Sequence, residues 1–199
     1  MNFLAHAYLS GDDAELMIGN FVADSIKGKT LSDYPQRIRE GVALHRAIDN
    51  FTDNHPVVRD SIETLRPVFS KFSGVVLDIY FDHFLARNWN QWSERDLTEY
   101  VSWVYKILVR RYLILPSRSK RILPFMMAQN WLVGYANFTD LERVFRGMTR
   151  RSNFYSGMEL AVIFLIENHD RLEVSFNEYF PDLKQFSNNY ISQLNLEVR

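Results

Sequence analysis

The segment from residue 75 to residue 89 constrains the fold most, because it is apolar at almost every position and yet carries two aspartates. A helix that is apolar on all its faces is usually buried. Asp78 and Asp82 lie four positions apart, so they share one face of that helix. A buried carboxylate needs a partner, because removing an unpaired charge from water is costly. We therefore expect a buried helix whose acidic face meets a cation; a salt bridge to Arg46 or Arg87, or a helix at the edge of the core, is the alternative.

Helical spacing of apolar residues continues along the rest of the chain. Asp13 and Ser93 are suitable N-caps, and Thr139 and Glu142 have the spacing of a capping box. We find no sustained strand-like alternation, no internal repeat and no long linker. The sequence predicts one all-α domain, residues 1–199, built as a helical bundle. The expected helices cover residues 14–26, 35–53, 56–67, 75–89, 93–115, a short segment after 139, 158–180, and 182 onward.

Composition and charge exclude several classes of protein. The chain has no cysteine, which rules out disulfides, thiolate metal sites and cysteine nucleophiles. With a net charge of -1 it has no overall basic field, so we expect no general affinity for nucleic acid. The longest apolar run, residues 160–166, is too short to cross a bilayer, and the first residues lack the basic region of a signal peptide. We expect a cytoplasmic protein that does not contact membranes.

Four of the five histidines lie in the first 83 residues, where aspartates are interleaved with them. Several of these residues interrupt apolar runs, and His45 and Asp49 share one helix face at positions i and i+4. Imidazole and carboxylate are the usual protein ligands of a hydrolytic divalent-metal centre. Because no thiolate is present, we expect Mn²⁺, with Mg²⁺ or Fe as alternatives. The candidate metal ligands are His6, Asp24, His45, Asp49, Asp78, Asp82 and His83.

Residues beside these candidate ligands have the chemistry for handling phosphate. The planar guanidinium of Arg46 matches phosphate oxygens, although it could instead be the structural partner of an aspartate. Asp49 or Asp53, one further turn along the same helix, could orient an attacking water. The remaining histidines are expected to be solvated, His55 in a turn and His169 on an exposed helix face among polar and charged neighbours.

Four strings resemble the acyl carrier protein phosphodiesterase family in their order and spacing, namely NFLAH, GNFVAD, GVALHRAIDNFTDNHP and LDIYFDHFLARNW. A later string, QNWLVGYANF, is similar to the aromatic segment of that family. The resemblance runs from residue 1 to about residue 135. The residues that match the family's strings are His6, Asn20, Asp24, His45, Arg46, Asp49, Asp53, Asp78, Asp82 and His83.

This resemblance implies a specific reaction. The family hydrolyses the phosphodiester that joins 4′-phosphopantetheine to a serine of acyl carrier protein, and thereby returns the apo carrier. It is described as an all-helical, divergent relative of the HD-domain metal phosphohydrolases, with manganese as the preferred ion, so an HD-domain-like bundle is implied here. One feature departs from ordinary HD enzymes: the doublet is Asp82-His83, the reverse of their His-Asp. Ligands therefore cannot be assigned by analogy with HD enzymes.

Residues 109–151 hold a local excess of positive charge in a chain that is nearly neutral overall. Acyl carrier proteins are acidic helical bundles, so the resemblance makes this stretch the expected docking surface for the holo carrier. A solvated helix face, or a contact with RNA or a lipid surface, would look similar. Helical spacing places the aromatic Tyr112 and Phe125 of this stretch in the core. The expected carrier contacts are Arg110, Arg111, Arg118, Lys120 and Arg121.

Two other functions remain open at this stage. A hydrolase of nucleotides or other small phosphoesters would keep the metal ligands but have no use for the basic stretch. A non-catalytic helical binding module would use the aspartates as salt-bridge partners and bind no metal.

Overall fold

In the computed structural model, which describes residues 2–26, 28–151 and 154–197, the chain is helical and those ranges contain no strand. This confirms the all-α prediction. The α-helices are α1 (Phe3–Tyr8), α2 (Ala14–Val22), α3 (Gln36–Asn54), α4 (Pro56–Phe69), α5 (Ser73–Arg87), α6 (Leu97–Arg110), α7 (Ser117–Ala128), α8 (Trp131–Gly134), α9 (Phe138–Thr149), α10 (Ala161–Glu167) and α11 (His169–Glu197). Short 3-10 turns lie between them: η1 (Ala23–Ser25), η2 (Gly28–Asp33), η3 (Ser70–Phe72), η4 (Trp89–Gln91), η5 (Tyr112–Ile114) and η6 (Met158–Leu160).

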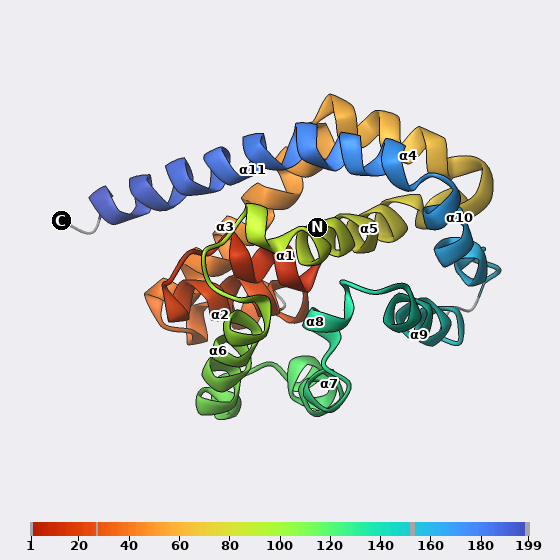
Figure 1. The fold of residues 1–199 in the computed structure, drawn as a ribbon. Helices are drawn as coiled ribbons and strands as arrows, with labels where there is room; N and C mark the ends of the chain where they lie inside the picture. The colour runs from red at the N-terminus through yellow and green to blue at the C-terminus, as the bar shows by residue number, and fades with distance from the viewer. Residues whose placement is uncertain (1, 27, 152–153, 198–199) are drawn as a thin grey trace.

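The long helix α11 runs along one edge of the molecule and packs across α3, α4 and α5 (Figure 1). The helices α6 and α7 lie at the opposite edge. The six-residue α1 lies in the middle and contacts both α2 and α5. A helix this short is not stable alone in water, so its neighbours must hold it in place. Within the described ranges, no helix is both long enough and apolar enough to cross a membrane.

Two prolines that were expected to end helices lie inside them instead. Pro67 is within α4, and Pro181 is within the continuous α11, so the predicted separation at residue 181 is wrong. Each proline leaves the backbone carbonyl four residues earlier without its helical donor. Glu63 and Asn177 hold those carbonyls, and both residues are exposed, as are the prolines. Water can therefore replace the missing hydrogen bonds, and the helices continue.

Helix starts agree with the sequence in some places and differ in others. Asp13 caps α2 as predicted, because its carboxylate accepts the N–H groups of the first turn. Asp96, not Ser93, caps α6, since the hydroxyl of Ser93 is used within its own loop. Asn137 caps α9 in place of the predicted box at Thr139. Asp96 directly precedes the first turn of α6, whereas Thr139 already lies inside the first turn of α9 and so cannot be its N-cap.

Helices α2 and α3 approach each other closely at two glycines. A Cβ atom on Gly19 would overlap the backbone oxygen of Ile38, and one on Gly41 would overlap the backbone oxygen of Leu16. Only glycine fits at such a backbone contact. The close approach places Asn20 of α2 beside His45 of α3, which prepares the candidate site.

Candidate metal centre

His6, His45 and Asp49 converge at one buried point. The Nε2 atom of His6 is 3.3 Å from Oδ1 of Asp49, and Nε2 of His45 is 3.1 Å from Oδ2. The two imidazole rings stack with centroids 3.9 Å apart. One ligand atom from each residue lies within 4.8 Å of the others. This spacing suits three ligands of one metal ion, and the three residues were all among the candidate ligands.

Asn20 fixes how both imidazoles are oriented. The Nδ1 atom of His6 donates to Oδ1 of Asn20 at 2.8 Å, and Nδ1 of His45 donates to the backbone carbonyl of Asn20, also at 2.8 Å. The Asn20 amide in turn donates to the backbone oxygen of His6 and to Ser10. A histidine held in this way at Nδ1 turns Nε2 toward the ion, as in known metal sites. Asn20, one of the residues that match the family strings, thus orients both imidazoles in the structure.

Because Nδ1 carries the proton in both rings, each Nε2 atom directs a lone pair at a carboxylate. That arrangement is favourable only if a cation lies between the nitrogen and the carboxylate. Among the described residues, Nε2 of His6 is buried without a hydrogen-bond partner. Burial would lower the pKa of His45, but Asp24 and Asp49 raise it to about 9. Burial would raise the pKa of Asp49, but the two imidazoles hold it well below its usual range. The donor set therefore fits a divalent ion, and without one a proton on His45 takes its place.

Further carboxylates surround this cluster and leave an open pocket of about 230 Å³. Asp24 lies with Oδ1 3.3 Å from Nε2 of His45, and its side chain is mostly exposed. Burial raises the pKa of Asp53, and the neighbouring charges of Asp49 and Asp78 raise it further. The pocket is lined by Asp24, His45, Asp49, Thr52, Asp53 and Asp78.

Thr52, which lines the pocket, and its buried partner Tyr179 were not predicted. The hydroxyl of Thr52 donates to the carbonyl of Ile48, and the hydroxyl of Tyr179 lies 2.5 Å from the Thr52 hydroxyl. Thr52 follows Asp49 by three positions on α3, so the helical repeat could have indicated it. Tyr179 comes from α11, and its partner is 127 positions away. No local pattern in the sequence announces that contact.

Asp82 does not join the cluster, which corrects its prediction as a metal ligand. The side chain is fully buried, and both its oxygens accept backbone N–H groups from the start of α1. Oδ2 accepts from Leu4 at 2.9 Å, and Oδ1 accepts from Ala5 at 3.2 Å and from Asn2 at 3.3 Å. The partner of this buried carboxylate is the positive end of a helix, not a metal ion.

His83 is also placed elsewhere, which corrects its prediction as a ligand of the same ion. Its Nδ1 atom donates to the backbone carbonyl of Tyr135 at 2.7 Å, and its ring stacks on Phe138. Burial lowers the pKa of His83 to about 4, so the ring is neutral. Consecutive residues on a helix point in directions about 100° apart, and Asp82 already faces α1.

Arg46 is exposed and makes no ion pair with the residues that the structure describes. The alternative that it pairs with an aspartate is therefore not observed in those ranges. On α3 it precedes Asp49 by three positions and Asp53 by seven, so all three side chains lie on one face. A guanidinium at this edge can reach an anion that sits over the pocket.

Within the basic stretch, the predicted carrier contacts lie at the end of α6 and the start of α7, on either side of the turn η5, and we call residues 110–121 the basic turn. Arg110, Arg118 and Arg121 are exposed, whereas Arg111 pairs with Glu15 at 2.8 Å. Helix α7 packs against η1, the turn that carries Asp24. The basic turn therefore neighbours one wall of the metal pocket. Lys120 differs from the exposed arginines, because its ammonium donates to a backbone carbonyl of η5.

The apolar residues of this stretch are less buried than predicted. Phe125 is 62% exposed, and Tyr112 is exposed too, so their assignment to the core is wrong. Leu113, at the tip of the turn, is 87% exposed. Helical spacing alone did not reveal that only part of the α7 surface packs against the rest of the protein.

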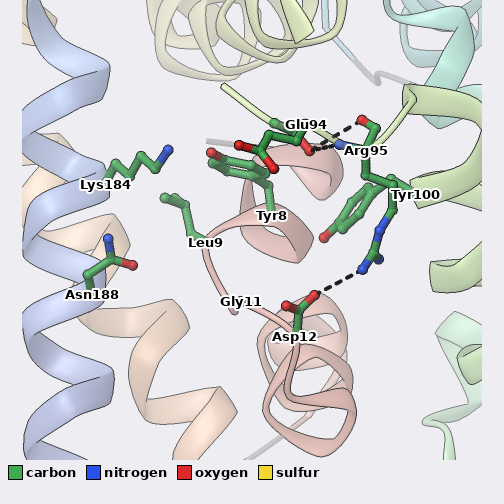
Figure 2. A pocket seen from close by; sticks show the side chains of 10 residues that line it. Tyr8, Leu9, Gly11, Asp12, Glu94, Arg95, Tyr100, Lys184 and Asn188 are labelled. Carbon is green, nitrogen blue, oxygen red and sulfur yellow. Dashed lines mark hydrogen bonds and ion pairs between the residues drawn. The ribbon is translucent and has the colours of Figure 1, made fainter. Parts of the chain in front are cut away.

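A larger pocket of about 550 Å³ lies between the loop after α1, the loop before α6, and α11. Figure 2 shows Lys184 and Asn188 of α11 on one side and the Arg95–Asp12 ion pair on the other. Tyr8 lines it, two positions after His6 and about 200° around α1. No imidazole or cluster of metal ligands lines this pocket, so the smaller pocket is the better candidate for metal chemistry.

Comparison with known proteins agrees with this geometry. The family model described as acyl carrier protein phosphodiesterase matches residues 1–183. The chain belongs to that family. A relative named acyl carrier protein phosphodiesterase from Klebsiella pneumoniae subsp. pneumoniae is 31% identical over 190 residues, covering 95% of this chain and 98% of the relative. Relatives of the same name from an Enterobacter species and from Escherichia coli are 31% and 30% identical over 182 residues, covering 91% of this chain and 94% of theirs.

The family assignment confirms the resemblance seen in the sequence and extends it beyond residue 135. The relatives are named as phosphodiesterases, which are hydrolases, as predicted for this chain. No solved structure matches, so the likeness to HD-domain enzymes stays a prediction.

Proposed function

We propose that this protein hydrolyses the phosphodiester between 4′-phosphopantetheine and the serine of holo acyl carrier protein, with the help of a divalent ion. The observation that carries the proposal is the convergence of His6, His45 and Asp49, with both imidazoles oriented by Asn20. The family and the names of its members supply the substrate. Mn²⁺ is the proposed ion, with Mg²⁺ or Fe as alternatives, because the donors are nitrogen and oxygen only.

The ion would be held by the Nε2 atoms of His6 and His45 and by the Asp49 carboxylate, with Asp24 beside them. A divalent ion at such a site lowers the pKa of a water molecule and offsets the charge of the phosphodiester. The pocket beside it is also lined by Asp53 and Asp78 and is open to solvent, so a phosphate group can enter it.

The chain's own residues then divide the remaining work. Asp53, whose pKa is raised by burial and by its acidic neighbours, accepts a proton from the attacking water. Arg46 holds a phosphate oxygen from the exposed edge of α3. Water adds to phosphorus, the bond from phosphorus to the serine oxygen breaks, and the proton accepted by Asp53 passes to that oxygen, so the serine leaves as an alcohol.

The carrier would dock on the basic turn. Arg110, Arg118 and Arg121 are exposed, and α7, which carries Arg118 and Arg121, packs against η1, so an acidic helix on this surface would bring its serine toward Asp24. The exposed Leu113 and Phe125 provide apolar contact within the same surface. A substrate without a carrier would not need this arrangement.

Mass spectrometry of holo carrier incubated with the protein and Mn²⁺ tests the proposal directly. We expect loss of the 4′-phosphopantetheine mass, and Asp49→Asn should slow it by at least about 100-fold because a ligand is lost. Asp182→Asn is the matched control, since this exposed aspartate also faces a histidine, His55, but lies outside the pocket. If the wild type leaves the carrier intact and cleaves a nucleotide or other small phosphoester, the rival hydrolase is correct. If it cleaves neither and binds no ion, the binding-module reading stands.

A further inference from the structure

A second cluster of metal-binding side chains lies at the start of α11, away from the site just described. Nδ1 of His169 is 3.6 Å from Oε2 of Glu173 and 3.7 Å from Oδ1 of Asp170. These distances are too long for hydrogen bonds. They suit ligands that share an ion, since two donors each about 2.1 Å from a metal lie roughly 3–4 Å apart.

His169 is not the solvated residue that the sequence predicted. Its side chain is only 17% exposed, and its ring packs against Phe84, Phe138 and His83. Its Nε2 atom is buried and has no hydrogen-bond partner in the described part of the chain. Packing therefore holds the ring with Nδ1 directed at the two carboxylates.

His83 packs beside His169 and offers it no hydrogen bond. Because Nδ1 of His83 donates to Tyr135, its Nε2 atom has a lone pair, and this atom, like Nε2 of His169, is buried without a partner among the described residues. The two rings are perpendicular, with centroids 5.8 Å apart. Nδ1 of His169 faces Glu173 and Asp170 without a hydrogen bond to either, and a cation between the three groups would offset the two negative charges.

Glu173 is oriented by a residue from another helix. The side-chain amide of Asn88, at the end of α5, donates to Oε1 of Glu173 at 2.5 Å. The other oxygen, Oε2, is left directed toward His169. An amide that holds one oxygen of a carboxylate while the other faces the ion is a common second layer around a metal site.

We propose that His169, Asp170 and Glu173 form a second metal site, which binds Zn²⁺ reversibly from solution. One imidazole and two carboxylates provide three ligands and leave a position open to water. Imidazole and carboxylate are both common Zn²⁺ ligands, so Zn²⁺ is a suitable ion with which to probe this site. A bound ion would tie the first turn of α11, through Glu173 and Asn88, to the end of α5. The proposal does not depend on the phosphodiesterase reaction, because the two sites share no residue.

Zinc stoichiometry, measured by calorimetry and by native mass spectrometry on the full chain, tests this site. We expect His169→Ala and Glu173→Gln each to bind one Zn²⁺ fewer than the wild type. His55→Ala is the matched control, because His55 is also mostly buried beside an aspartate of α11, 3.4 Å from Asp182, but has no second carboxylate. It should keep the wild-type stoichiometry.

The conservative Glu173→Gln variant keeps the test decisive if His169→Ala fails to fold. The proposal is overturned if Glu173→Gln binds as many zinc ions as the wild type. It is also overturned if His55→Ala loses one zinc ion in the same way, because binding would then be a general property of surface histidines.

Discussion

Asp49 on α3 and Asp82 on α5 both reach the short helix α1, but they meet different partners there. Asp49 faces two imidazole rings and lies at the wall of an open pocket. Asp82 is sealed in the core and accepts three backbone N–H groups. Burial raises the pKa of Asp82 to about 7 despite those bonds, whereas the imidazoles lower the pKa of Asp49. The same residue type thus faces two imidazoles at an open pocket in one place and anchors a helix in the other.

Both carboxylates help to fix His6, which is part of α1: Asp49 faces its imidazole, and Asp82 binds the start of its helix. Asp49 would share an ion with its imidazole. Asp82 holds the first turn of its helix, and α1 is too short to keep its position without help. We therefore interpret Asp82 as a positioning residue for the metal centre, although it touches neither ion nor substrate.

Replacing Asp82 should have the largest effect on stability. Asp82→Ala leaves three backbone N–H groups buried without acceptors, and we expect the free energy of unfolding to fall by about 4 kcal/mol. Asp96→Ala is the matched control, since that carboxylate also caps a helix, α6, but is exposed. Its loss should cost about 1 kcal/mol. Urea unfolding of both variants measures the difference, and equal losses would contradict the anchoring role.

A conservative change at Asp82 separates its effect on the position of α1 from its effect on the stability of the fold. Asp82→Asn should keep the fold but weaken Mn²⁺ binding by about tenfold, because an amide holds α1 less well than a carboxylate. Asp96→Asn should leave Mn²⁺ binding unchanged. Calorimetry on both variants decides the point, and unaltered affinity in Asp82→Asn would mean that His6 does not depend on this anchor.

The pH dependence of the metal-free protein tests the electrostatic side of the comparison. The pKa of His45 is raised to about 9 in the folded chain from 6.5 when unfolded. Its contribution to stability is fully present below pH 6.5 and is lost as the pH rises through 9. With a chelator present, we expect a loss of about 3 kcal/mol over this range. Unfolding curves at several pH values measure it; Asp49→Asn should flatten the trend, and His55→Ala should not.

The smallest expected effect concerns the basic turn, which lies outside both carboxylate regions. Arg118→Glu with Arg121→Glu should lower kcat/KM for holo carrier by several-fold, or about 1 kcal/mol, most clearly at low salt. A small phosphodiester such as bis-p-nitrophenyl phosphate should be hydrolysed equally by wild type and variant. Parallel losses on both substrates would place these arginines in the active site, and no loss on either would place carrier docking elsewhere.

The sequence predicted the parts of the site that depend on one helix. His45 and Asp49 are paired by the i, i+4 repeat, and Asp53 follows by the same rule. The role of Asp82 could not be found in this way, because its partners are backbone N–H groups about 80 positions away, and every residue except proline has one. The break expected at Pro181 failed for a related reason. Whether a proline ends a helix depends on solvent exposure, which is a property of the folded chain.

The contact between Gly19 and Gly41 sets the spacing of α2 and α3, and with it a dimension of the candidate metal centre, through backbone atoms alone. Because two backbones touch there, the separation of α2 and α3 has a hard lower limit, and Asn20 meets His45 at that limit. A methyl group at Gly19 would act as a wedge that widens the site from a distance, without altering any ligand. Selection for a larger ion could therefore act at positions that have no side chain.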